Sequence, residues 1–399
     1  MPAPIVILGF NDPEAKEIER LTRNLNLSGY YLMHGNTRVS RNDAYRGNRF
    51  QQFSGVRTQF ENRINNVRNE LLFIESKHPS VETRLRRLSK DGIPRATITH
   101  IDHHHPGDPG YDVDEFYYLL GSSIGQFIDK IVGEWNYRIE EFSWTKRLDR
   151  GVCMPGVQYV DHPDYNWIVV RYADDGELEQ AVIPKRILIT AVADHCLPAG
   201  YKGQCPGVDP QELREYRSAI RAKMNRTTPE KIEKTIEFTQ RKLRSMAVGG
   251  IADLTNLPGG TLPEAPEAAS REGVAVLCRV KDARTRRRKI LLFGDANPSL
   301  IERWMEEHRE CAYEVYGSPT RGYAGAILDP PEGSVDLHET TQRKADEAFD
   351  DASQSMAIRK FQHRKFSKSG FLRANRRKRV MKLPDHNNSG RECNGKKRH

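Results

Sequence analysis

The chain of 399 residues is well above the roughly 150 residues of an average domain, so we expect two or three domains with a sizeable core. This length excludes a small disulfide-stapled scaffold, and the 37% hydrophobic and 29% charged residues are typical of a soluble protein with a polar surface or some disordered length. Neither an apolar run near the roughly 20 residues that cross a bilayer nor a basic signal-peptide start occurs, so we expect no membrane contact and a cytoplasmic location, or a nuclear one in a eukaryotic host.

The net charge of +9 is concentrated at the C-terminal end. Residues 359–399 hold fifteen Lys or Arg and two acidic residues, a local charge of +13, which leaves −4 for the rest of the chain. Phe361, Phe366 and Phe371 are interleaved with these basic residues, a composition that suits phosphate contact and base stacking. We therefore expect residues 333–399 to form a polar, basic, disordered tail that contacts nucleic acid, with a solvated or nuclear-localisation segment as the alternative.

In chain order, short apolar runs of strand length alternate with helical patterns over the first 255 residues. The predicted strands are 5–8, 30–33, 71–75, 96–102 and 187–194, and the predicted helices are 13–24, 115–135, 210–223 and 229–246. Nearly continuous apolar strands alternating with helices predict an α/β fold with a parallel sheet covered on both faces. Residues 157–182, with Asp175-Gly176 at a turn, predict a β-hairpin insertion.

A second, smaller α/β unit is predicted after a Pro- and Gly-rich stretch over 256–273, which has the composition of a linker. This unit covers 274–332, with strands over 274–280, 290–293 and 313–316, a helix over 298–308 and a Gly-rich turn. The six cysteines form no Cys-x-x-Cys pair, which predicts reduced thiols; a zinc site built on Cys196 and Cys205 is the alternative.

Ionisable residues gather where predicted strands end. Glu75 ends one strand, Asp194 ends another, and the run His100-Ile-Asp-His-His-His105 holds four of the thirteen histidines at the end of a third. Ligands of open parallel sheets bind at the carboxyl ends of the strands. Because neutral imidazoles and carboxylates together suit a divalent ion, we predict a metal site here, with a solvated His-rich loop as the alternative.

Ile101-Asp102-His103-His104, followed by a Gly/Asp loop and a helix with Gly121-Ser-Ser-Ile-Gly125, resembles the signature motif of the DHH phosphoesterase family. The order of a sheet domain over 1–255, a linker and a DHH-associated substrate-binding domain over 274–332 is similar as well. The resemblance implies a hydrolase that holds two divalent ions, manganese or else magnesium, and cleaves phosphodiester bonds of oligonucleotides or small nucleotides with metal-activated water. The oligomeric state is left open.

By the same resemblance, Asp12, Glu14, Glu75, His103 and Asp194 are the metal ligands. His104 matches a histidine that contacts the phosphate, and Asp102 is expected to orient His103. In the second unit, Gly317, Arg321, Gly322 and Gly325 match a Gly-rich loop that binds the substrate.

The first motif departs from the family. Glu14 stands where the family has a second aspartate, and Leu8 stands where it has a histidine, so one ion has fewer ligands, with His34 or His195 as further candidates. This departure and the basic tail favour a second hypothesis, a nucleic-acid-binding or adaptor protein that keeps the fold but binds metal incompletely. A metallo-β-lactamase is disfavoured, because Asp102 stands where its His-x-His-x-Asp-His run requires a histidine and the antiparallel start of that fold is missing.

Overall fold

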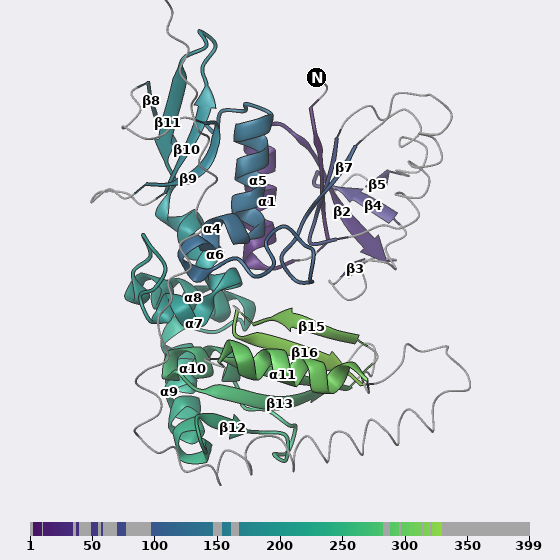
Figure 1. Cartoon of the computed structure of the whole chain (residues 1–399), viewed down its shortest axis with the longest axis vertical. Coiled ribbons are helices and arrows are strands. Elements are labelled where there is room, and N and C mark those ends of the chain that lie inside the picture. Colours follow the sequence, from purple (N-terminus) through teal and green to yellow (C-terminus); the bar gives the residue numbers. More distant parts are fainter. Residues whose placement is uncertain are drawn as a thin grey trace, which may run out of the picture.

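The computed structural model describes residues 3–9, 11–34, 37–39, 49–54, 57–58, 70–76, 97–146, 154–160, 167–281, 288–294, 297–310, 312, 314–319 and 321–328. It contains three β-sheets with helices packed between and beside them (Figure 1). The predicted tail over 333–399 lies outside these residues. No helix in the described part is long and apolar enough to cross a membrane.

The first sheet has the strand order β5-β4-β2-β1-β6-β7, with β3 paired to β2. Its strands are β1 (Ile5–Leu8), β2 (Ser28–His34), β3 (Thr37–Arg38), β4 (Arg49–Gln52), β5 (Arg57–Thr58), β6 (Leu71–Ile74) and β7 (Ile98–Ile101). The four neighbours β2, β1, β6 and β7 are parallel, as predicted. Antiparallel pairs add β3, β4 and β5, so the sheet as a whole is mixed rather than parallel.

Helices α1 (Pro13–Asn24) and α5 (Ser123–Ile128) lie between the first and second sheets in Figure 1. Helix α1 has the predicted bounds because Asp12 caps it, accepting a hydrogen bond from the Ala15 N–H at 2.6 Å, and Pro13 has a φ suited to the first turn. Its buried residues Ile18 and Leu21 join the core with strands β1 and β6.

The single helix predicted over 115–135 is interrupted. A 3₁₀ turn η2 (Glu115–Tyr117), α4 (Tyr118–Gly121), α5 and a π-helical segment η3 (Asp129–Glu134) follow one another. The break falls at Ser122, whose backbone is extended and whose side chain caps α5 through the Gly125 N–H. A side chain at Gly125 would meet the Leu119 carbonyl oxygen, so the close approach of the two segments needs glycine here.

The strand predicted over 187–194 is wrong: these residues belong to helix α6 (Lys185–His195). The run Ile-Leu-Ile-Thr-Ala-Val is buried throughout, because α6 packs among α1, α4, α5, α7 and α8. A helix that is buried on every side has no polar face, and a short apolar run of this kind does not distinguish it from a buried strand. Asp194 therefore lies in the last turn of a helix, not at a strand end.

The predicted hairpin insertion is part of a larger antiparallel sheet with the order β8-β11-β10-β9. Its strands are β8 (Ser143–Thr145), β9 (Gly156–Tyr159), β10 (Trp167–Tyr172) and β11 (Leu178–Val182). The expected Asp-Gly turn joins β10 to β11, with Gly176 at φ +82° and its N–H donating to the Ala173 carbonyl.

The C-terminal part contains a five-stranded sheet with the order β12-β13-β14-β16-β15. Its strands are β12 (Ile251–Asp253), β13 (Ala275–Lys281), β14 (Arg288–Gly294), β15 (Glu314–Ser318) and β16 (Tyr323–Ile327). The helices of this half of the chain are α7 (Leu197–Tyr201), α8 (Pro210–Met224), α9 (Pro229–Met246), α10 (Ala265–Glu272) and α11 (Pro298–Arg309).

Most elements predicted for this part are present, namely α8, α9, β13, β14, α11 and β15. The stretch 256–273, which has the composition of a linker, contains helix α10, whose alanines pack into a core with α9 and β13. Strands β12 and β16 were not predicted, because β12 is only three residues long and β16 lies in the sequence expected to form a Gly-rich turn. The predicted domain limits remain predictions.

Candidate metal centre

Side chains from four elements meet at one edge of the first sheet. Glu75 directly follows β6, His103 and His104 follow β7, and Glu14 lies in the first turn of α1, just after β1. Because β1, β6 and β7 are parallel neighbours, their carboxyl ends meet at the same edge. Asp194 reaches this edge from the last turn of α6. It therefore belongs to the cluster, although the strand predicted to carry it is a helix.

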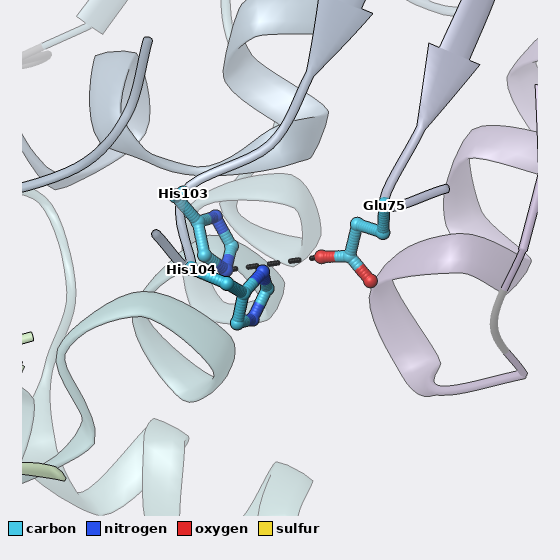
Figure 2. A group of neighbouring side chains, drawn as sticks. All are labelled: Glu75, His103 and His104. Atoms are coloured by element: carbon cyan, nitrogen blue, oxygen red, sulfur yellow. Dashed lines mark ion pairs between the residues drawn. The ribbon is translucent and has the colours of Figure 1, made fainter. Parts of the chain in front are cut away.

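Two overlapping groups have the geometry of a metal site. Glu14, Glu75, His103 and Asp194 each offer one ligand atom, and these atoms all lie within 4.8 Å of one another. Glu75, His103 and His104 form the second group, in which Figure 2 shows both imidazoles facing the carboxylate. All of these side chains are buried except Asp194, which is partly exposed. The sequence-predicted ligands Glu14, Glu75, His103 and Asp194 are therefore brought together.

Glu75 is held in an unusual conformation. Its φ of +49° is in the left-handed region that non-glycine residues rarely adopt, and its N–H donates to the Ile101 carbonyl at 2.9 Å. The Ser123 hydroxyl donates to Glu75 Oε1 at 3.1 Å and lies 3.5 Å from His103 Nδ1. Strained backbone of this kind gathers at functional sites. Ser123 was not predicted to take part; its place in the Gly-Ser-Ser-Ile-Gly helix was the available signal.

Glu14 is a buried carboxyl group among other acids. Its Oε1 accepts a hydrogen bond from the Ile124 N–H at 2.9 Å, while Oε2 has no hydrogen-bond partner in the described part of the protein. Burial, followed by the charges of Asp194, Glu75 and Asp12, raises the pKa of Glu14 well above its ordinary value of 4.5. Asp12 thus acts on the cluster through its charge, while one of its oxygens caps α1.

His103 is fully buried, and its Nε2 lies 3.0 Å from Asp194 Oδ2 and 3.8 Å from Glu75 Oε1. Burial and the nearby Arg321 guanidinium lower the pKa of His103 from 6.5 to about 3. The imidazole is therefore neutral at physiological pH, which is the form that binds metals. His195 is a second neutral imidazole beside it, with ring centres 5.4 Å apart, and its Nε2 bonds to the Val113 carbonyl. The side chain of His34 lies outside the described residues.

Asp102 contacts a different histidine from the one expected. Its Oδ1 accepts the Nδ1–H of His104 and also the backbone N–H of His103 at 2.7 Å. Because a carboxylate can only accept, the proton of His104 resides on Nδ1 and its Nε2 is the basic atom. Asp102 therefore orients the His104 ring rather than that of His103, whose Nδ1 lies near Ser123 instead.

The predicted substrate loop reaches the same cluster. Arg321 donates hydrogen bonds to the carbonyls of Asp194, at 2.6 Å, and His195, at 3.0 Å, and its guanidinium lies 3.6 Å from Asp194 Oδ2. Its described contacts thus hold the C-terminal end of α6. Ser318 also donates to Asp112 at 3.1 Å, so the β15–β16 turn is joined to the loop after the histidines.

The three glycines predicted to bind substrate have structural roles. Gly317, at φ +134°, and Gly325 lie in the paired strands β15 and β16, where an added Cβ would meet Ala324 and the Tyr316 ring respectively. Gly322, at φ +67°, allows the turn between these strands to approach the Gly294 carbonyl. These backbone contacts explain why glycine occupies the three positions, with no need for a bound substrate. The contact of these glycines with a substrate stays a prediction.

The donor set suits a hard or borderline divalent ion. Three carboxylates and one neutral imidazole are the ligand types that manganese, magnesium and zinc accept. Burial, followed by repulsion among the carboxylates, raises the pKa of Glu14, and its Oε2 has no hydrogen-bond partner among the described residues; a bound cation would compensate both. The residues present therefore fit a divalent ion.

Comparisons with protein-family models, with curated proteins and with solved structures find no significant match to this chain.

Proposed function

We propose that the protein is a divalent-metal-dependent phosphoesterase that hydrolyses phosphodiester bonds of oligonucleotides or small nucleotides. One observation carries the proposal: Glu14, Glu75, His103 and Asp194 converge, largely buried, at the carboxyl ends of adjacent parallel strands. The Asp102-His103-His104 motif, which resembles that of the DHH phosphoesterases, contributes to the same edge.

Manganese or magnesium is the proposed cofactor, in one or two positions. The four-residue group is the proposed primary position, since it offers the larger ligand set. The group of Glu75, His103 and His104 shares two of those residues, so a second ion is expected to bind more weakly. When bound, such ions activate a water and neutralise charge on the phosphoryl group.

The protein's own residues have separate tasks in this proposal. His104, with its proton placed on Nδ1 by Asp102, offers a basic Nε2 that can accept a proton from the attacking water when no second ion occupies that nitrogen. Arg321 holds the last turn of α6 and adds positive charge next to Asp194, which favours an anionic substrate. Ser123 keeps the Glu75 carboxylate in place for the ion.

The test is a hydrolysis screen with oligonucleotides, cyclic dinucleotides and pyrophosphate in the presence of MnCl₂. We expect hydrolysis of at least one nucleotide substrate by the wild type and its loss in the His103→Ala/Asp194→Ala double variant. His105→Ala is the matched control, because His105 lies in the same loop but outside both ligand groups. Equal hydrolysis by the double variant and the wild type would refute the proposal.

The second candidate function is a nucleic-acid-binding or adaptor module with weak metal occupancy. The basic segment over 359–399 and Leu8, at the end of the first strand, favour it. Metal analysis of the purified protein separates the two candidates: tightly held ions favour the enzyme, and a metal-free protein that binds polynucleotides favours the adaptor.

A further inference from the structure

Two buried cysteines lie in contact next to the candidate metal centre. The Sγ atoms of Cys196 and Cys205 are 3.2 Å apart, and each residue is only 2% exposed. The sulfurs of a disulfide are about 2.05 Å apart, so a shift of about 1.2 Å would bring this pair to bonding distance. Cys278, the third described cysteine, is also buried but lies in β13 of the C-terminal sheet.

Cys196 is built into the end of α6. It directly follows Asp194 and His195, its N–H donates to the Val192 carbonyl at 3.1 Å, and its own carbonyl accepts the Gly200 N–H of α7 at 3.0 Å. A displacement of Cys196 is thus transmitted to the last turn of α6, which carries Asp194.

Cys205 lies in a turn between two glycines. Gly203 and Gly207 on either side have φ values of +69° and +80°. The turn is tied to the rest of the protein by the Tyr118 hydroxyl, which donates to the Pro206 carbonyl at 2.9 Å. Only nine positions separate the two cysteines, and they enclose α7.

We propose that Cys196 and Cys205 form a reversible disulfide, and that this bond weakens metal binding at the neighbouring cluster. The second part rests on the proposed function. The oxidant is a small disulfide such as oxidised glutathione. One protein thiolate attacks it, giving a mixed disulfide and one free thiol; the other protein thiolate then attacks the protein sulfur of the mixed disulfide and releases the second thiol. The protein pair loses two electrons, the small disulfide gains them, and the two protons end on the released thiols.

The experiment equilibrates the folded full-length protein in glutathione buffers of increasing oxidised fraction, followed by acid quenching, alkylation and trypsin digestion. Long incubation is needed because the buried thiols react through local opening. Trypsin cuts after Lys202, so the disulfide would join the peptides 187–202 and 203–214. We expect these linked peptides in the oxidising buffers and their separation on return to reduced glutathione.

Mn²⁺ affinity is measured by calorimetry on portions of the equilibrated protein that are taken before quenching and digestion. We expect the oxidised protein to bind Mn²⁺ roughly tenfold more weakly, in the range seen when groups behind metal ligands are disturbed. Cys205→Ser is expected to remove both the linked peptides and the redox dependence of Mn²⁺ affinity, whereas Cys278→Ser is expected to keep both.

Failure to link the peptides in the folded protein, while unfolded protein links them in the same buffer, would overturn the proposal. Linked peptides with unchanged Mn²⁺ affinity would overturn the coupling to the metal centre. Linked peptides in a protein that binds no Mn²⁺ in either state would support the disulfide and count against the proposed function alone.

Discussion

Replacing Glu14 with glutamine is expected to stabilise the metal-free protein while weakening metal binding. Glu14 is 1% exposed, and only one of its carboxylate oxygens has a hydrogen-bond partner in the described structure. A buried polar group left without a partner costs about 1–3 kcal/mol, and more when it is charged. Glutamine keeps the oxygen that accepts from Ile124 and adds an N–H₂ group that can donate to the neighbouring carboxylates. We therefore expect Glu14→Gln to stabilise the metal-free protein by about 2 kcal/mol at pH 8.

The stabilising effect of Glu14→Gln on the metal-free protein is expected to depend on pH. The folded protein keeps a proton on Glu14 above pH 4.5, where the unfolded chain loses it, because the pKa of Glu14 is raised in the folded state. The contribution of Glu14 to stability is thus fully present below pH 4.5 and is lost as the pH rises through the folded-state pKa. The gain from Glu14→Gln should accordingly grow from pH 5 to pH 8.

The assay is thermal unfolding at several pH values, once with EDTA and once with excess MnCl₂. A ligand at a hundred times its Kd stabilises by about 2.7 kcal/mol, so Mn²⁺ should raise the melting temperature of the wild type and raise that of Glu14→Gln less. Glu17→Gln is the matched control on the same helix, because Glu17 pairs with Arg20 at 2.7 Å and Arg186 at 2.8 Å and its loss should not stabilise. A Glu14→Gln protein that melts below the wild type in EDTA at pH 8 would refute the reasoning.

Three further outcomes are expected. Ser123→Ala should lower Mn²⁺ affinity about tenfold by calorimetry, because it removes the hydrogen bond to Glu75; unchanged affinity would show that Ser123 has no such role. His195→Gln should reduce the loss of stability on acidification in EDTA, because the pKa of His195 is lowered from 6.5 to about 3 and its contribution is lost as the pH falls through that range; a curve parallel to that of the wild type would contradict this. Truncation after Ser355 should weaken polynucleotide binding and flatten its salt dependence, since it removes the basic segment 359–399; undiminished affinity at low salt would show that the segment does not bind phosphates.

Local signals predicted much of the fold. Asp12-Pro13 predicted the start of α1, and the apolar runs at 5–8 and 71–75 predicted β1 and β6. A helix cap and a short buried strand can be predicted locally, because both depend on residues that are neighbours in the sequence. The apolar run at 187–194 was predicted as a strand but belongs to helix α6. This helix is buried on all sides, so its sequence has no polar face that would distinguish it from a buried strand. The antiparallel additions to the first sheet likewise depend on pairings between distant segments.

The sequence predicted which residues contribute to the candidate site, but it did not predict the contacts between them. The motif around His103 and the acids Glu14, Glu75 and Asp194 were identified from sequence, and the fold brings them together. The contact of Asp102 with His104, however, depends on rotamers that no spacing specifies. The engagement of Arg321 with the end of α6 depends on how the β15–β16 turn packs against the first part of the chain, which no local pattern encodes.

The most direct test of the central claim is the anomalous difference map of a crystal of the full-length protein grown with MnCl₂. We expect a manganese peak in contact with Glu14, Glu75, His103 and Asp194, and the loss of that peak in the His103→Ala/Asp194→Ala variant. A well-ordered crystal in which these four side chains converge without a peak would contradict it.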